Sequence, residues 1–363
     1  MNVPYVGVLL NRSMFKGIPT GKTQTEKLAF YDEGAKKYGV KPCYFCLEDV
    51  SPKRDRVKAY VKTAQSYQLI EIPLPPIIHN RALYFSRIAK NKITQLAERG
   101  IIIFNRWNRY GKLYIHSLLV EDPAIADHLP ETVSGSLDNL RYMMGKHRAL
   151  FLKPDSGSIG AGIMRIEKKK NKWVLPYREM INNKRVWLRK EFQQQIPLRI
   201  QQAFEKRAYL IQEALPLAEY KKRPFDFRVS VQRNFTGEWS ITGIVGKVAK
   251  AGHYLSNVGQ GGKVYTIQQL LQEYPNLKER EVVQSITQLS LAIVERLSMV
   301  LPDLADVGLD IGISNEGFPF FIECNGRDQR YSFRNGALLK EWKNTYSNPM
   351  GYARYLMEIQ GRL

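Results

Sequence analysis

The stretch VGLDIGISNEGFPFFIECNGR, residues 307–327, indicates the fold of the whole chain. Residues 307–313 and 318–323 are rich in β-branched and aromatic side chains, which favour strands. The sequence SNEG between them, residues 314–317, is typical of the turn that closes a hairpin. The stretch therefore predicts two antiparallel strands joined by a tight connection.

The polar residues of this hairpin are expected on one face. A turn centred in the middle of SNEG places Asp310 opposite Phe321, and side-chain alternation puts Asp310, Glu323 and Asn325 on the same face. Oxygen ligands without His or Cys suit Mg²⁺ that bridges phosphate oxygens better than zinc or a redox metal. The alternative is a half-buried hairpin whose polar residues face water, and the hairpin alone does not separate the two.

The composition favours a soluble protein with anionic partners. A chain of 363 residues is long enough for two or three domains. Its net charge of +21 favours nucleotides, nucleic acid, anionic polymers or a membrane surface, although a basic solvated surface explains part of it. The chain has no apolar run of 18 residues, and the first residues lack the pattern of a signal peptide. We therefore expect a cytoplasmic protein without a transmembrane segment.

The cysteines and histidines predict no chemistry of their own. Three cysteines exclude a disulfide framework. Cys43 and Cys46 form a C-x-x-C, but no second pair or nearby His completes a metal site, and an extended backbone would direct the two thiols to opposite faces. We expect structural thiols, with Cys324 pointing away from the metal face into a core. No role is assigned to His79, His116, His128, His147 or His253.

The first hundred residues predict a small α/β domain of parallel type. A strand at residues 3–11, a helix at 25–38 and a strand at 40–47 follow in order. The sequence GIPTGKT at residues 17–23 resembles a phosphate-binding P-loop, but three residues separate its glycines where four are required. We reject the P-loop interpretation.

A glycine-rich loop follows the strand at residues 150–154. Lys153 lies at the end of that strand, the loop DSGSIGAG covers residues 155–162, and a second strand is expected at 163–166. Glycines allow backbone N–H groups to approach phosphate oxygens closely, and Lys153 adds a point charge. The alternative is a flexible hairpin with a surface lysine, but the pattern favours phosphate binding.

The remaining segments supply helices and strands. Residues 178–207 are strongly basic and are expected to be helical, either as a solvated face or as a docking face for an acidic partner. A long amphipathic helix is expected at 279–297, and a closing helical region is expected to break near Pro349. Further helices are expected at residues 81–99, 112–120, 137–146 and 266–272, and strands at 101–104, 208–213, 224–233 and 239–248.

An ordered series of motifs then resembles a known family. The motifs are Gly111-Lys112 with a later LPET at 129–132, residues 151–162, residues 209–215, FDFR at 225–228, Asn257 with Gly261-Gly262, and Asp310 followed thirteen residues later by Glu323-x-Asn325. Over about residues 100–330 the chain resembles the ATP-grasp superfamily, and within it the YheC/YheD-like endospore coat-associated proteins. The resemblance implies an ATP-grasp fold of α/β class, with a small α/β domain at 1–104 and two grasp lobes at 105–208 and 209–363.

The resemblance also implies site residues and two departures from the family pattern. Gly111 stands where many members have Asp or Asn, and Lys247 where arginine is common, so its anion contacts would be monodentate. The implied roles are Lys112 and Lys153 for the ATP phosphates, Ser156, Gly157, Ser158, Gly160 and Gly162 for the lid loop, Gln212, Glu213, Ala214 and Leu215 for adenine, Glu219 for ribose, Arg228, Lys247 and Asn257 for the γ-phosphate and acceptor, with Arg228, Lys153 and Asn257 catalytic, and Asp310, Glu323 and Asn325 for Mg²⁺.

The function expected from the resemblance is an ATP- and Mg²⁺-dependent carboxylate–amine ligase acting through an acyl phosphate. The basic charge favours an acidic peptide or polymer as acceptor, in a spore-related process. The alternative is a structural protein of the spore coat that binds ATP without turnover. Nucleic acid as a partner is disfavoured, since no nucleic-acid-binding signature accompanies the charge.

Overall fold

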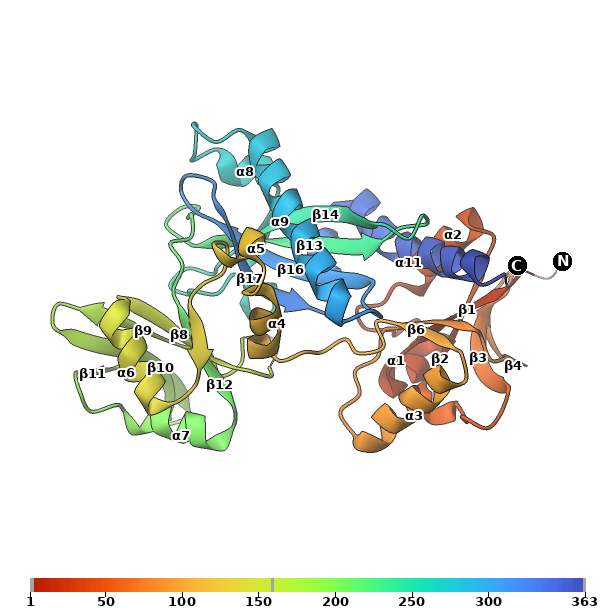
Figure 1. The fold of residues 1–363 in the computed structure, drawn as a ribbon, viewed down its shortest axis with the longest axis horizontal. Helices are drawn as coiled ribbons and strands as arrows, with labels where there is room; N and C mark the ends of the chain where they lie inside the picture. Colours follow the sequence, from red (N-terminus) through yellow and green to blue (C-terminus); the bar gives the residue numbers. More distant parts are fainter. Residues whose placement is uncertain (1–2, 158–159, 362–363) are drawn as a thin grey trace.

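The computed structural model describes residues 3–157 and 160–361. Three sheets organise this part of the chain, and the α/β class predicted from the sequence is confirmed. Figure 1 shows the N-terminal sheet and the middle sheet on opposite sides of the C-terminal sheet. The C-terminal sheet therefore lies between the other two sheets.

The N-terminal sheet has the strand order β4-β3-β2-β1-β5-β6. Its neighbours β2, β1, β5 and β6 run parallel, as expected, whereas β3 and β4 form an antiparallel extension. Cys43 and Cys46 are buried, free thiols in its core, in agreement with a structural role. The elements are β1 (Tyr5–Leu9), α1 (Arg12–Gly17), η1 (Ile18–Thr20), α2 (Leu28–Lys37), β2 (Lys41–Phe45), η2 (Leu47–Asp49), β3 (Arg56–Lys62), β4 (Tyr67–Pro73), β5 (Ile77–Asn80), α3 (Arg87–Glu98) and β6 (Ile102–Phe104).

Helix α3 is shorter than the helix expected at residues 81–99. The Oγ atom of Ser86 accepts a hydrogen bond from the backbone N–H of Ala89, which satisfies one of the free donors of the first turn. The residues before Ser86 therefore remain outside the helix. Arg81, at the carboxyl end of β5, becomes available for the buried ionic cluster described below.

The middle sheet is antiparallel in the order β11-β10-β9-β8-β12-β7. The helix expected over residues 178–207 is wrong for most of its length. Residues 172–192 form a hairpin in which Trp173 pairs with Phe192, and its outer part, from Arg178 to Ile181 on β10, is exposed. An exposed, basic hairpin lacks the alternation of apolar and polar residues by which a strand is recognised in sequence. The elements are α4 (Lys112–Leu119), α5 (Pro123–Ala126), β7 (Thr132–Ser134), α6 (Leu137–Lys146), β8 (Ala149–Pro154), β9 (Met164–Lys169), β10 (Lys172–Ile181), β11 (Lys184–Phe192), α7 (Leu198–Lys206) and β12 (Tyr209–Glu213).

The C-terminal sheet has the order β15-β14-β13-β16-β17, and helix α9 packs on one of its faces. Every residue of β16 is buried. The opposite face carries the polar residues discussed below. The elements are β13 (Phe225–Arg233), β14 (Trp239–Val248), η3 (Val258–Gln260), β15 (Lys263–Tyr265), α8 (Ile267–Leu271), α9 (Glu279–Val300), β16 (Asp306–Ile313), β17 (Pro319–Asn325), α10 (Tyr331–Asn335) and α11 (Leu339–Ile359).

The hairpin of β16 and β17 forms as predicted, but its register differs. Asp310 pairs with Glu323 and not with Phe321, because a bulge shifts the register between Asp310 and Ile311. A bulge adds an unpaired residue to one strand, here Ile322, and turn position alone does not reveal it. The shift places the two carboxylates directly across from each other.

Helix α11 continues through Pro349, so the predicted break near that residue is wrong. A proline inside a helix leaves the carbonyl four residues earlier without its N–H partner. Here that carbonyl belongs to Thr345, and it accepts a hydrogen bond from Nε2 of Gln232 at 2.9 Å. The side chain from β13 thus replaces the missing backbone donor, and α11 packs against α2 of the N-terminal domain.

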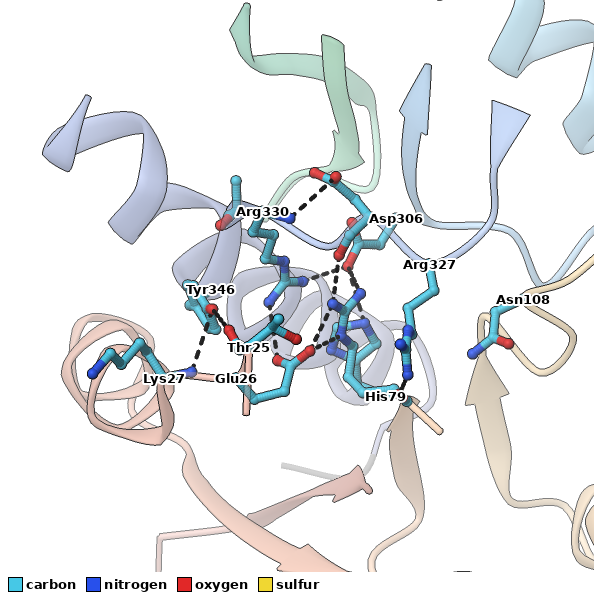
Figure 2. Close-up of polar contacts among 12 residues, drawn as sticks. Thr25, Glu26, Lys27, His79, Asn108, Asp306, Arg327, Arg330 and Tyr346 are labelled. Carbon is cyan, nitrogen blue, oxygen red and sulfur yellow. Dashed lines mark hydrogen bonds and ion pairs between the residues drawn. The ribbon is translucent and has the colours of Figure 1, made fainter. Parts of the chain in front are cut away.

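A buried ionic cluster joins the N-terminal domain to the C-terminal sheet (Figure 2). Arg81 donates from Nη2 to Glu26 at 2.8 Å and from Nη1 to Asp306 Oδ2 at 3.3 Å. Arg330 also donates to Asp306 and lies 3.8 Å from Glu26. Two arginines therefore face two carboxylates, all of them almost fully buried.

His79 completes the cluster as a neutral group. Burial lowers the pKa of His79 to about 4, although Asp306, whose Oδ2 lies 3.2 Å from Nε2 of His79, opposes this change. Burial acts to raise the pKa of Asp306, but Arg330, His79 and Arg81 hold it well below its usual range. Asp306 is consequently ionised, and the cluster contains equal numbers of positive and negative charges.

Candidate active site

A cleft with two adjoining chambers, of about 320 and 170 Å³, lies where the middle sheet faces the C-terminal sheet. The larger chamber extends to Leu83 and Arg327 at the N-terminal domain, and the smaller one extends along β12 and the loop at residues 254–258. The residues shared by both chambers include Lys112, Lys153, Gly157, Gln212, Glu323 and Asn325. The cleft therefore gathers predicted phosphate and metal residues from segments far apart in the sequence.

Asp310 is the centre of a buried ionic network on the polar face of the C-terminal sheet. Arg228 donates from Nε to Oδ1 at 2.8 Å and from Nη2 to Oδ2 at 3.2 Å, which is a bidentate pair. Lys247 Nζ lies 2.8 Å from Asp310 Oδ1 and 2.8 Å from Asp226 Oδ1. Ser256 in turn donates to Asp226. The network holds two cations against the wall of the smaller chamber.

The charges in this network have shifted pKa values. Burial acts to raise the pKa of Asp310, but Arg228 and Lys247 lower it to about 2. Burial, and then the charge of Asp310, raise the pKa of Asp226, while Lys247 opposes the shift. Burial lowers the pKa of Lys247, but Asp226 and Asp310 outweigh it and raise the value. Asp310 is therefore ionised and Lys247 protonated at neutral pH.

Lys153 is a buried cation without a carboxylate contact among the described residues. Its side chain is 8% exposed, its Nζ donates to Oε1 of Gln212, and it lies 5.4 Å from the centre of the Phe151 ring. Burial lowers the pKa of Lys153 to about 8, and the charge of Glu323 partly offsets this effect. A buried ammonium group in an open cleft has an unmet requirement for an anion. Its place at the end of β8, beside Gly157, fits a phosphate.

The face formed by Asp310, Glu323 and Asn325 fits Mg²⁺ in its donor set. Glu323 Oε1 lies 3.2 Å from Lys112 Nζ. The buried Nδ2 of Asn325 has no hydrogen-bond partner among the described residues, so this donor is open to a phosphate oxygen while Oδ1 is the atom that suits a metal. Asp310 Oδ2 accepts one hydrogen bond and retains a free lone pair. Within residues 3–157 and 160–361, no three His, Cys, Asp or Glu side chains are placed to hold a metal alone. Mg²⁺ commonly completes such a site with phosphate oxygens and water.

The contacts around Gly111 explain why a glycine stands before helix α4 in this chain. Helix α4 begins at Lys112 with Gly111 as N-cap, a residue that has no side chain to cap the helix. Asp155 provides the cap from the glycine-rich loop, because its Oδ1 accepts the backbone N–H of Leu113 at 2.8 Å. A Cβ atom at position 111 would lie 2.5 Å from Oδ2 of Asp155. An Asp or Asn at position 111 would therefore collide with Asp155, which caps the helix in its place.

The single change Gly111→Asp is expected to lower the free energy of unfolding by about 1–3 kcal/mol through overpacking. The double variant Gly111→Asp with Asp155→Ala should recover most of that loss, because the cap returns to its own helix. Denaturant unfolding of both single variants and the double variant measures the coupling. Gly145→Ala is the control, since nothing lies within 4 Å of its Cβ position and alanine favours a helix interior. Additive effects of the two changes would contradict the replacement of the cap.

The structure gathers most of the predicted site residues, but not all. Asn257, Gly160, Glu213, Leu215 and Lys247 line the smaller chamber together with the residues named above. Gly162 lies beyond it, and its φ of 80° together with a hydrogen bond from the Tyr209 hydroxyl to its carbonyl fixes the base of the loop. Ser158 lies outside the described residues. Ser156, Ala214 and Glu219 do not line either chamber, and Glu219 instead contacts Tyr274 through its backbone.

Sequence reasoning missed Asp328. Its Oδ1 accepts from Nη1 of Arg228 at 3.1 Å, and its side chain is fully buried. A Cβ atom on Gly308 would lie 2.7 Å from that oxygen, so a glycine is required for the contact. Asp328 follows β17 in an irregular segment, where no periodicity indicates its orientation. Only its closeness in sequence to Glu323 and Asn325 could have drawn attention to it.

None of the helices in the described part of the chain combines the length and apolar character needed to span a bilayer.

The comparison with relatives supports the resemblance seen in the motifs. Endospore coat-associated protein YheD of Bacillus subtilis (strain 168) is 26% identical over 306 residues, which cover 79% of this chain and 64% of that protein. Endospore coat-associated protein YheC of the same strain is 23% identical over 356 residues, which cover 90% of this chain and 91% of that protein.

Solved structures confirm the ATP-grasp fold. The ATP-grasp ligase PsnB, complexed with a phosphomimetic variant of a minimal precursor, Mg and ADP, has a TM-score of 0.54 at 13% identity. The match covers 95% of this chain and 100% of that one. The model of the YheC/D-like ATP-grasp family matches residues 100–356, which include the series of motifs from Gly111 to Asn325. This chain therefore belongs to the YheC/D-like ATP-grasp family.

Proposed function

We propose that this chain is an ATP- and Mg²⁺-dependent carboxylate–amine ligase that acts through an acyl phosphate. The observation that carries the proposal is Lys153, a buried ammonium group with no carboxylate contact among the described residues, beside a glycine-rich loop and opposite Glu323. A triphosphate in this cleft would supply the missing negative charge. Membership in an ATP-grasp family supports the same nucleotide.

The proposed reaction has two steps. An oxygen of the acceptor carboxylate attacks the γ-phosphorus of ATP, the bond to the β-phosphate oxygen breaks, and ADP leaves. The amine then attacks the acyl carbon, phosphate leaves with the bonding electrons, and the amine loses a proton to form an amide. No protein nucleophile is required, in agreement with the absence of a convincing nucleophilic set in the sequence.

The residues of the cleft would act by positioning and by charge. Lys153 and Lys112 would bind phosphate oxygens, and Gly157 would let the loop backbone approach them. Arg228 is held by Asp310 and Asp328 and would stabilise negative charge as it develops near the γ-phosphate. Bound to Asp310, Glu323 and Asn325, Mg²⁺ would neutralise phosphate charge and orient the transferred group.

The remaining assignments belong to the same proposal. Gln212, Glu213, Ala214 and Leu215 would border adenine, Glu219 would contact ribose, and Asn257 with Lys247 would face the acceptor. The net charge of +21 favours an acidic peptide or polymer as acceptor, because it raises the local concentration of anions. The names of the relatives motivate a spore-related process, and a cytoplasmic location is part of the same proposal. The fold itself does not fix the acceptor.

The test is nucleotide binding by the purified full-length chain. Titration with ATP and Mg²⁺ should show binding that weakens about 10- to 100-fold in Lys153→Ala and in Glu323→Ala, since each removes a charged contact. Lys172→Ala and Glu191→Ala are matched controls, because these residues form an exposed ion pair away from the cleft. Wild-type protein that does not bind ATP, or affinity unchanged in both cleft variants, would refute the proposal.

Turnover is tested separately. Amino acids, acidic peptides and spore extracts would be screened for acceptor-dependent ADP formation, with the product mass measured afterwards. Nucleotide binding without ADP formation from any acceptor would favour the alternative of a spore-coat protein that binds ATP without turnover. The same screen at low and high salt tests the acidic acceptor, since charge attraction weakens as salt is added.

A further inference from the structure

Three arginines meet where the N-terminal domain contacts residues 325–330, but in the described part of the chain two of them have carboxylate partners and the third has none. Arg81 and Arg330 are paired with Glu26 and Asp306 in the buried ionic cluster. Arg327 is drawn apart from those carboxylates in Figure 2. Arg327 donates hydrogen bonds from Nη1 to the carbonyl of Arg81 at 3.2 Å and to Oδ1 of Asn11 at 3.4 Å. Within the described residues, Arg327 therefore has no carboxylate at ion-pair distance, although the charge of Glu26 acts on it from further away.

Arg327 lines the larger chamber of the cleft. Asn108, labelled near it in Figure 2, lines the same chamber, as do Arg109 and Lys153. Gly326 allows this arrangement, because a Cβ atom there would lie 2.9 Å from the backbone of Asn108. Arg327 therefore lies at the boundary between the N-terminal domain and the cleft, two residues beyond Asn325.

The chamber has an excess of positive charge that the nucleotide would not remove. Among the residues that line it, Glu323 is the single acidic side chain, and Lys112 already lies 3.2 Å from it. Lys112 and Lys153 are shared with the smaller chamber, whereas Arg327 and Arg109 line the larger one alone. A partly buried guanidinium without a counter-ion costs free energy unless a ligand supplies one. A planar, forked donor favours a carboxylate.

We propose that Arg327 binds a substrate carboxylate that is not the one phosphorylated. The substrate class is then an acid with a second free carboxylate, or an amine that carries one, such as an amino acid or a peptide end. The identification of this carboxylate as part of a substrate rests on the proposed ligase function. The claim that Arg327 binds an anion in the larger chamber is independent of that function.

The experiment measures the thermal unfolding temperature of the full-length protein without nucleotide. The probes are 20 mM succinate, a dicarboxylate without an amine, and 20 mM glycine, with chloride at matched ionic strength as reference. We expect succinate, glycine or both to raise the unfolding temperature of the wild type by about 2 °C or more. The rise should be lost in Arg327→Met and kept in Arg106→Met, which removes an arginine paired with Asp303 outside the chamber.

A second comparison separates a binding role from a structural one. Without probes, Arg327→Met should unfold at or above the wild-type temperature, because no carboxylate loses its partner, whereas Arg330→Met should unfold at a clearly lower one. A response to succinate would assign the carboxylate to the acid substrate, and a response to glycine alone would assign it to the amine.

Three results would overturn the inference. They are no response of the wild type to either probe, an equal response in Arg327→Met, and a loss of stability in Arg327→Met as large as that in Arg330→Met. Failure of the proposed ligase function would look different. The wild type would then not bind ATP and Mg²⁺, while the carboxylate response would remain.

Discussion

Replacing Asp306 with asparagine is expected to reduce the free energy of unfolding by about 3–5 kcal/mol. The change preserves size but removes one of the two negative charges that face Arg81 and Arg330. Both arginines would then remain buried with Glu26 as their one carboxylate partner. Urea or thermal unfolding of the purified protein at neutral pH, where Asp306 is ionised, measures the loss.

The control for this change is Asp303→Asn, three residues earlier in the chain. Asp303 lies 2.8 Å from Arg106, but both side chains are 28% exposed, so the loss should stay below about 1 kcal/mol. Comparable losses in the two variants would show that burial does not increase the contribution of an ion pair to the free energy of unfolding here. Separate unfolding transitions of the N-terminal domain and the remainder in Asp306→Asn would locate the damage at the contact between them.

The second large effect is expected in catalysis. Arg228→Lys should lower ADP formation by about 100- to 1000-fold while changing nucleotide affinity only a few-fold, because the lost contact acts on charge that develops during the reaction. Lysine keeps the charge but cannot reach Asp310 and Asp328 with a fixed fork. The assay would use the best acceptor from the screen, or slow ATP hydrolysis if none is found.

Arg233→Lys is the matched control, since Arg233 lies on the same strand but donates to the carbonyl of Gly237 and packs over Trp239. It should leave ADP formation unchanged. A fall in nucleotide affinity as large as the fall in turnover would assign Arg228 to ground-state binding. Full activity in Arg228→Lys would remove the role proposed for the guanidinium.

The strand and helix pattern near the cleft could be predicted because it follows local rules. Periodicity and turn residues identified β8, β13, β14, β16, β17 and α6. Two different features caused the errors, one local and one at long range. The hairpin of β10 and β11 was hidden by its charges, and α11 passes through Pro349 because Gln232, 113 residues away in sequence, satisfies the carbonyl of Thr345.

The candidate site shows the same division. Lys112, Lys153, Glu323 and Asn325 came from motifs and lie together in the cleft. The pairing of Asp310 with Glu323 depends on a bulge, which is decided by packing and not by the turn sequence.

The contacts of the remaining site residues depend on three-dimensional proximity. The capping of α4 by Asp155 and the hold of Asp328 on Arg228 join segments whose closeness only the folded chain creates. The roles of all these residues in ATP chemistry stay predictions until the variants are measured.

Strand β16 carries Asp306 near one end and Asp310 four residues later, so both point to the same side of the sheet. One carboxylate secures the contact between domains, and the other belongs to the cleft. Inserting or deleting one residue at the start of this strand would turn both carboxylates toward helix α9 at once. A one-residue insertion or deletion here would therefore remove the cleft carboxylate and destabilise the fold at the same time. Purifying selection for stability would preserve the geometry of the site even in a lineage that no longer uses it.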